Sequence, residues 1–356
     1  MEKRVTIKDI AKAAGVSLGT VHCALNGKPG VGEPTRARVA AIANEMGYRV
    51  NGAAASLKRG KLRIAAAFPG LTTESQYYFS FVWEGVRAYI DTLLDYNVEL
   101  LEVPFYGGAN NQTSALSALL EDERIDGLLT TGYTDVCGRV SLREFEKRHV
   151  PVVLVGNDVP QSARLCCVQP HYQIIGRTLA ELLSRQVPAA GGILLLSGDV
   201  MDPSHYQVVG GFDEYVLAHA LKNPIYKVHL SGGNEEAYAR VARELANNEA
   251  IAACCAVNAR GSVLLGKALC QTGRAGRMPA VGSDLFAENV QFLKDGVFTN
   301  LLYKKPYSQA YTAARYLADF LLRGARPAKD VIYLGNEVIF QSSLPMYDNG
   351  LFRLIR

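Results

Sequence analysis

Short apolar runs alternate with segments of helical periodicity over most of this chain, and this alternation constrains its fold more than any other feature. The apolar runs lie at 62–68, 98–103, 126–131, 151–156, 191–197, 225–230, 251–257, 279–284 and 297–303, and two closing strands are expected after them. Helical spacing of apolar residues occurs between them, at about 78–95, 112–121, 139–148, 172–185, 205–220, 235–247, 261–271, 286–294 and 307–322. Because parallel strands need crossover connections, this order predicts an α/β body with parallel sheets covered by helices on both faces. The length suffices for two such lobes.

Candidate ligand-binding residues follow from the same pattern. Ligands of open parallel sheets bind beyond the carboxyl ends of the strands, so the polar and aromatic residues directly after the apolar runs are the candidates. They are Tyr77, Tyr78, Phe79, Asn157, Asp158, His171, His205, Asn258, Asp284 and Lys304. Aromatic rings suit stacking on sugar faces, and amides and carboxylates pair with hydroxyl groups. A role as a loop-surface or helix-capping residue remains the alternative for each of them.

The first 46 residues have a different character and predict three short helices. Apolar residues at i, i+3, i+4 and i+7 form the stripe Ile7, Ile10, Ala11 and Ala14. Thr6 is expected to cap this first helix with its hydroxyl, and Gly15 permits a tight turn after it. Ser17 is expected to cap a second helix, and a third helix is expected over about 33–46.

Positive charge is concentrated in this N-terminal part. Residues 1–60 hold ten Lys and Arg against four Asp and Glu, a net of +6, whereas the other 296 residues hold 28 against 30, a net of −2. A small basic helical domain of this kind is suited to binding the phosphates of double-stranded DNA. An ordinary solvated helical face is the alternative that charge alone leaves open.

The segment resembles the headpiece of the lactose-repressor (LacI/GalR) family. The matching residues are Thr6, Ile7, Asp9, Ile10, Ala11, Ala14, Gly15, Val16, Ser17, Thr20, Val21, Leu25 and Asn26, and the similarity continues through Tyr48, Asn51, Ser56 and Leu57. The resemblance implies a helix-turn-helix headpiece at 1–49 and a hinge helix or linker at 50–60. It also implies a ligand-binding and dimerisation domain at 61–356, with two discontinuous lobes of the type I periplasmic-binding-protein kind between which the chain crosses three times.

The resemblance also implies roles in DNA binding. Phosphate contacts are expected from Thr6, Ser17, Thr20, Asn26 and Thr35, whereas Leu18, Gly19 and Cys23 occupy positions that usually face base edges. The usual Ser-Arg pair is His22-Cys23 here, so the Arg that can bond guanine bidentately is replaced. His22 is either a substitute donor to a base or a phosphate contact.

The hinge is the next part to which family roles carry over. Asn51 belongs to the similar segment, and Leu57 matches the leucine that enters the minor groove when the hinge becomes helical on DNA. Val50 and Ala55 replace the family's usual Pro and Arg. A flexible basic linker is therefore the alternative to a hinge helix.

Exchanges in the ligand cleft point to the class of ligand. Asp284 matches a sugar-binding position of the family, and Asn258 matches the first residue of a common Asn-Asp pair. A frequent Arg is Val208 here, whereas Lys304 and His171 add basic groups. These exchanges favour a sugar or sugar derivative with an acidic group. Neutral sugars, polyols and nucleosides stay open.

Together these features predict a cytoplasmic DNA-binding transcriptional regulator, a repressor controlled by a small polar effector. Its expected partners are a near-palindromic double-stranded operator, the effector and a second copy in a homodimer. A solute-binding protein of a transport or sensing system is the alternative, disfavoured by the headpiece and by the charged N-terminus without a signal peptide.

An enzyme, a metal site and a membrane protein are each disfavoured by the sequence. It presents no nucleophile–base constellation, and we expect no cofactor or metal. Asp199, Asp202 and His205 are spaced like a loose metal cluster, but we expect loop residues and a helix cap before Pro203. No apolar run approaches the ~20 residues needed to span a bilayer.

Overall fold

A computed structural model describes residues 5–25, 29–46, 48, 60–106, 108–122, 124–132, 141–199, 202–230 and 232–347. The chain divides into two compact units. The first consists chiefly of the residues up to Leu62, with the short segments Leu93–Val98 and Leu322–Gly324, and the second, here called the body, contains the rest. The expected hinge lies almost wholly outside the described residues, so the boundaries at 1–49, 50–60 and 61–356 stay a prediction.

The headpiece has the three predicted helices, α1 (Ile7–Ala14), α2 (Leu18–Leu25) and α3 (Glu33–Glu45). Their buried residues form one small cluster, which consists of Ile10, Ala11, Ala14, Val21, Ala24, Val39 and Ala43. The stripe predicted for the first helix is confirmed for Ile10, Ala11 and Ala14, whereas Ile7 is only partly buried and packs against this cluster.

Local hydrogen bonds fix where the headpiece helices begin and end. The Asp9 carboxylate accepts from the Thr6 backbone N–H at 2.8 Å and from the Thr6 hydroxyl at 2.6 Å, so Thr6 is the N-cap of α1 and forms a capping box with Asp9. Gly15 adopts φ +64° at the end of α1. The Ser17 hydroxyl accepts from the Thr20 N–H at 3.1 Å, which confirms its expected capping role in α2.

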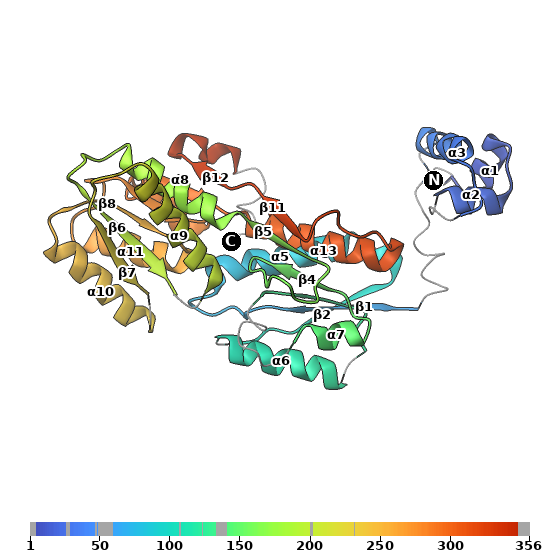
Figure 1. The fold of residues 1–356 in the computed structure, drawn as a ribbon, viewed down its shortest axis with the longest axis horizontal. Helices are drawn as coiled ribbons and strands as arrows, with labels where there is room; N and C mark the ends of the chain where they lie inside the picture. The colour runs from blue at the N-terminus through green and yellow to red at the C-terminus, as the bar shows by residue number, and fades with distance from the viewer. Residues whose placement is uncertain are drawn as a thin grey trace. The chain divides into compact units, whose positions relative to one another are not determined.

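The body contains two six-stranded sheets, one in each lobe (Figure 1). In the first lobe the strand order is β11-β5-β4-β3-β1-β2. These strands are β1 (Leu62–Ala67), β2 (Val98–Glu102), β3 (Gly127–Thr130), β4 (Val152–Val155), β5 (Cys166–Pro170) and β11 (Val331–Leu334).

In the second lobe the order is β12-β10-β9-β8-β6-β7. Its strands are β6 (Gly192–Gly198), β7 (Ile225–His229), β8 (Ile251–Ala256), β9 (Ala280–Ser283), β10 (Asn300–Tyr303) and β12 (Glu337–Ile339). The chain passes from β5 to β6, back from β10 to β11, and forward again to β12. The three predicted crossings are thereby confirmed.

The ladders are parallel, as predicted, from β1 through β3, β4 and β5 to β11, and from β7 through β6, β8 and β9 to β10. β12 instead pairs antiparallel with β10. Between β10 and β12 the chain passes through α13 and through β11 of the first lobe, so β12 enters the second sheet from the other lobe and not by a strand–helix–strand crossover within one sheet.

Helices cover both faces of each sheet, as the strand–helix alternation predicts. In the first lobe these are α5 (Gln76–Asp91), α6 (Gly108–Asp122), α7 (Arg143–Lys147) and α13 (Pro306–Arg323). In the second they are α8 (Tyr172–Ser184), α9 (Pro203–Ala218), α10 (Asn234–Asn247), α11 (Ala259–Gln271) and α12 (Ala287–Lys294). The described residues also contain two short 3-10 turns, Leu94–Tyr96 and Gln341–Met346. Among the described residues, no helix combines the length and the apolar character that crossing a membrane requires.

Helices α8 and α9 approach each other at two glycines. A methyl group on Gly176 would lie 1.9 Å from the Val208 carbonyl oxygen, and one on Gly211 would lie 2.1 Å from that of Gln173. Only glycine therefore fits at these two crossing points of α8 and α9.

Candidate functional site

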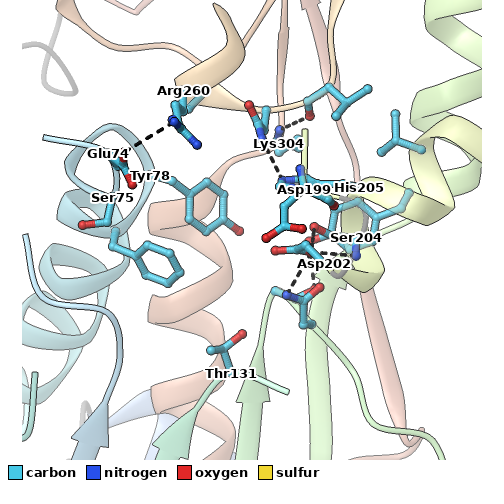
Figure 2. A pocket seen from close by; sticks show the side chains of 18 of the residues that line it. Glu74, Ser75, Tyr78, Thr131, Asp199, Asp202, Ser204, His205, Arg260 and Lys304 are labelled. Carbon is cyan, nitrogen blue, oxygen red and sulfur yellow. Dashed lines mark hydrogen bonds and ion pairs between the residues drawn. The ribbon is translucent and has the colours of Figure 1, made fainter. Parts of the chain in front are cut away.

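A cavity of about 240 Å³ opens at the carboxyl ends of the strands of both lobes (Figure 2). In liquid water this volume holds about eight molecules, which suits a small organic ligand. The first lobe lines it from the end of β3, the end of β4 and the first turn of α5, and the second lobe from the ends of β6, β7, β8 and β10. The position agrees with the rule from which the candidates were chosen.

Six of the ten candidate ligand-binding residues line the cavity. They are Tyr78, Phe79, Asn157, His205, Asn258 and Lys304. The other four, Tyr77, Asp158, His171 and Asp284, are not among the lining residues. Each of these four is held by a neighbour that the sequence alone did not reveal.

Tyr77 and Phe79 lie two residues apart on α5, so they point to different sides of the helix. Tyr77 stacks on Phe286, with 4.9 Å between the ring centroids, within an apolar cluster that also contains Phe81 and Val263. Phe79 instead faces the cavity. Tyr77, predicted to bind the ligand, instead packs against Phe286 of the other lobe.

Asp158 and His171 are also turned to protein partners. The Asp158 carboxylate forms an ion pair with Arg164, and both side chains are largely buried. The His171 ring stacks on Tyr333 of β11, with 4.8 Å between the centroids. In the structure, Asp158 and His171 therefore contact protein side chains and do not line the cavity.

Asp284 and Lys304 form a buried ion pair behind the cavity wall. Lys304 Nζ lies 2.9 Å from Asp284 Oδ2, 3.0 Å from the Val257 carbonyl oxygen and 2.5 Å from Ser283 Oγ. A lysine ammonium has three N–H donors, and these three partners use all of them. Lys304 therefore lines the cavity without a donor left for a ligand.

The hydroxyl groups of the lining residues Tyr78 and Tyr172 also donate to protein acceptors. The Tyr78 hydroxyl donates to Gln309 Oε1 at 3.1 Å, and the Tyr172 hydroxyl donates to the Gly156 carbonyl at 2.8 Å. Burial and the nearby Asp284 carboxylate raise the pKa of Tyr78 well above its ordinary value, so its phenol stays protonated at neutral pH. Because its hydroxyl proton is donated to Gln309, the part of Tyr78 that is available to a ligand is its aromatic ring.

Asn258 caps α11 and orients His205. Asn258 Oδ1 accepts from the Gly261 backbone N–H at 2.7 Å, which turns Asn258 Nδ2 toward His205 Nε2 at 3.1 Å. The other ring nitrogen of His205 lies 3.1 Å from the Asp199 backbone nitrogen. Both nitrogens of the imidazole are therefore engaged within the protein.

Two contacts cross the cavity from one lobe to the other. Asn157 Nδ2 of the first lobe lies 3.4 Å from Asp202 Oδ1 of the second, and Arg260 on α11 lies 3.4 Å from Glu74, which precedes α5. Asp202 also caps α9 by accepting from the Ser204 N–H at 2.8 Å, as expected for a residue before Pro203. Both contacts therefore join residues of the two lobes at the cavity.

Several lining residues were missed by sequence reasoning. Thr131 and Asp199 directly follow β3 and β6, so the strand-end rule could have identified both. Glu74, Tyr172 and Arg260 lie in or beside the first turns of helices, and no spacing in the sequence indicated which way their side chains point.

The candidate DNA-binding residues lie on the headpiece, and α2 exposes several of them. Leu18 is 48% exposed, and Gly19 and His22 are also exposed, whereas Thr20 and Cys23 are partly buried. Thr6 and Ser17 are exposed residues directly before α1 and α2, and Thr35 lies on α3. Asn26, Asn51 and Leu57 lie outside the described residues.

Two family models match the chain. The model for "Bacterial regulatory proteins, lacI family" matches residues 6–51, and the model for "Periplasmic binding protein domain" matches residues 66–325. The second match covers more than half of the chain and includes both lobes.

Curated relatives carry names of transcriptional regulators. Catabolite control protein A of Streptococcus mutans is 29% identical over 153 residues, which are 43% of each chain. The HTH-type transcriptional repressor PurR of Vibrio parahaemolyticus is 30% identical over 162 residues, which are 45% of each chain. The matched part of the chain thus spans less than half of the length of these relatives.

Solved structures share the fold of the body. The glucose-galactose binding protein GanP of Geobacillus stearothermophilus aligns with a TM-score of 0.69 at 18% identity, over 80% of this chain and 99% of that one. A LacI transcriptional regulator from Bacteroides fragilis, described as putative, aligns with the same TM-score and identity over 81% and 100%. The chain therefore belongs to the periplasmic binding protein domain family and carries a lacI-family helix-turn-helix headpiece in residues 6–51.

Proposed function

We propose that this protein is a DNA-binding transcriptional regulator, a repressor whose affinity for its operator is controlled by a small polar ligand. The observation that carries the proposal is the union, in one chain, of a lacI-family headpiece and a body with a polar interlobe cavity. A headpiece alone would bind DNA without a ligand, and a body alone would bind a ligand without DNA. Their presence in one chain supports control of DNA binding by the ligand. The regulatory names of the curated relatives support the same conclusion.

The headpiece is proposed to bind a near-palindromic site as one half of a homodimer, acting in the cytoplasm. Helix α2 enters the major groove with Leu18, Gly19, His22 and Cys23 toward the bases. Phosphate contacts from Thr6, Ser17, Thr20, Asn26 and Thr35 fix the register of each headpiece. Asn51 and Leu57 are proposed to act in the hinge, where Leu57 enters the minor groove.

Ligand control is proposed to act through the lobe arrangement. A ligand in the cavity changes the contacts Asn157–Asp202 and Glu74–Arg260, which join the two lobes. Only a difference in ligand affinity between two lobe arrangements can transmit a signal, and couplings of this kind are about 1–3 kcal/mol.

The proposed effector is a sugar or sugar derivative. The cavity combines aromatic rings with amide and carboxylate groups, and a sugar-binding protein such as GanP shares the fold. In the sequence, the basic residues Lys304 and His171 favour an acidic effector. The Lys304 ammonium donates to three protein oxygens, and the His171 ring stacks on Tyr333. Neither group therefore supports an acidic effector.

The proposal is tested by footprinting the full-length protein on genomic DNA, followed by gel shifts on the recovered site. We expect protection of a near-palindromic site and an affinity that changes when a sugar is added. Failure to bind any double-stranded DNA at low salt would overturn the proposal and favour a solute-binding role.

A further inference from the structure

One cation on the cavity wall keeps hydrogen-bond donors for a ligand. Arg260, the second residue of α11, lines the cavity, and its guanidinium has five N–H donors. Its Nε donates to Asn234 Oδ1 and its Nη2 donates to the Gly232 carbonyl oxygen, each at 2.7 Å. No hydrogen bond or ion pair joins Nη1 to any residue that the structure describes. Both donors of Nη1 are therefore available to a ligand.

The charge of Arg260 is only loosely compensated within the protein. Of the described residues, Glu74 is the one carboxylate paired with it, and Glu74 Oε1 lies 3.4 Å from Arg260 Nη2. The side chain of Glu74 is 45% exposed, whereas that of Arg260 is 18% exposed. A single contact to a half-exposed carboxylate is weak. An anionic group on a ligand can take this place, because the Glu74 side chain can turn to solvent.

The other charged groups of the wall favour a ligand with a single negative charge. Lys304 gives its three donors to protein oxygens, so Arg260 is the lining cation that remains for a ligand. Asp199 and Asp202 both have partners within the protein, and Figure 2 shows them across the cavity from Arg260. One guanidinium balances one carboxylate. A phosphate ester, with a charge of about −2, would keep an uncompensated charge beside the two aspartates.

The rest of the wall suits a polyol. Thr131 lines the cavity directly after β3, and within the described part of the chain its hydroxyl forms no hydrogen bond. A hydroxyl both donates and accepts, so it can pair with a hydroxyl of the ligand. The rings of Tyr78 and Phe79 suit the apolar face of a sugar. Figure 2 shows Thr131 and Arg260 well apart, which suits a ligand with a carboxylate at one end and hydroxyl groups at the other.

We propose that the ligand of this cavity is a sugar acid, a monosaccharide-sized polyol whose carboxylate binds Arg260 and takes the place of Glu74. The inference rests on the proposed function, because it assumes that the interlobe cavity is the effector site. Glu74 belongs to the first lobe and Arg260 to the second, so the bound acid replaces a contact between the lobes. The residue that supports an acidic ligand is therefore Arg260, which the sequence did not single out.

The test is calorimetric titration of the full-length protein with matched hexose derivatives at pH 7. The probes are the uronate, the aldonate, the neutral sugar and the 6-phosphate of the glucose, galactose and mannose series. We expect at least one acid to bind tenfold or more tightly than the neutral sugar and the 6-phosphate of its series. The inference is overturned if no acid binds, or if a neutral sugar or a phosphate binds as tightly as the acid.

Two variants at the contact should act in opposite directions. Arg260→Gln removes the cation and should weaken acid binding tenfold or more, while any weak binding of the neutral sugar stays unchanged. Glu74→Gln removes the competing carboxylate and should strengthen acid binding severalfold, which a purely structural role of Arg260 would not produce. Acid binding that is unchanged or weaker in Glu74→Gln would overturn the exchange.

Arg240→Gln is the matched control. Arg240 also lies in the second lobe, on α10, where it donates to the His229 carbonyl oxygen at 3.0 Å and pairs with Glu236, but it does not line the cavity. Its variant should leave acid binding unchanged, and circular dichroism compares the folding of all variants. Equal losses in Arg240→Gln and Arg260→Gln would overturn the assigned contact. If Arg260→Gln does not fold, the direction of the Glu74→Gln effect decides the inference.

A gel shift on the same samples separates the two proposals. If the protein binds DNA and responds only to a neutral sugar, the regulator stands and the sugar-acid inference fails. If an acid binds at Arg260 but leaves DNA binding unchanged, the ligand class stands and the regulatory coupling fails.

Discussion

Lys304 Nζ and Asp284 Oδ2 lie 2.9 Å apart, with the two residues only 5% and 1% exposed. The lysine backbone N–H also donates to the other carboxylate oxygen, Oδ1, at 3.1 Å, so the carboxylate is held from two directions. Asp284 occupies a position that resembles a sugar-binding one, but its charge is neutralised within the protein. Lys304 therefore lines the cavity while the Asp284 carboxylate lies behind the wall, engaged within the protein.

Loss of the ammonium group should destabilise the body. Lys304→Met keeps a side chain of similar length but leaves Asp284 charged, buried and without its cation. Removal of one partner of a buried pair costs about 3–5 kcal/mol. Urea unfolding followed by circular dichroism should show a lower midpoint with an unchanged denaturant dependence.

The double variant Lys304→Met, Asp284→Asn separates charge from packing. Asn keeps an oxygen for the Lys304 backbone N–H and tolerates the φ of +71° at this position. Because no buried charge remains, most of the lost stability should return. A double variant as unstable as the single one would show that the pair contributes through packing instead.

Neighbouring glycines on α9 should respond in opposite directions to alanine. Gly211→Ala brings a methyl group to 2.1 Å from the Gln173 carbonyl and should cost about 1–3 kcal/mol, because α8 and α9 must separate. At Gly210 no atom lies within 4 Å of the new methyl group, so Gly210→Ala should stabilise the helix by about 0.5–1 kcal/mol. Thermal unfolding of the two variants compares them in one helix. Similar midpoints would contradict the close crossing of α8 and α9.

The fold could be predicted from the sequence because its main signals are local. The apolar runs of parallel strands are buried on both faces, so they stand out as continuous stretches, as in β6, where every residue from Gly192 to Gly198 is buried. The antiparallel direction of β12 could not be predicted, because it depends on how the chain returns after β11 and not on the residues of the strand.

The site was predictable only in part, since the strand-end rule gives a position along the chain but not a partner. It placed Asn157 and Lys304 at the cavity. It could not show that Lys304 would turn to Asp284, or that Asp158 would pair with Arg164, because these pairings depend on tertiary contacts.

His22 should carry part of the operator selectivity. It is exposed on α2 one turn after Leu18, so the two side chains lie on the same face of the helix. We expect His22→Ala to lose methylation interference at operator guanines while its affinity for unrelated DNA stays within about twofold, since a base contact is worth about 1–3 kcal/mol only on the correct sequence. A uniform loss on all sequences would instead identify His22 as a phosphate contact.

Arg36 should stabilise the headpiece in a way that its charge alone does not explain. Its Nη1 donates at 3.1 Å to the carbonyl oxygens of both Cys23 and Ala24, so it joins α3 to the last turn of α2. Removal of these charge-assisted bonds should cost about 1–2 kcal/mol at the end of α2. Hydrogen exchange of the α2 amides in Arg36→Ala should be correspondingly faster, by roughly tenfold.

Arg38→Ala is the matched control, because Arg38 also lies on α3 and carries the same charge but is exposed. Both variants lower the headpiece charge by one, so both should weaken DNA binding at low salt to a similar electrostatic extent. Only Arg36→Ala should speed α2 exchange and lose further affinity at higher salt, where the order of α2 matters more than charge. Equal exchange rates in the two variants would show that the contacts to Cys23 and Ala24 do not hold α2 in place.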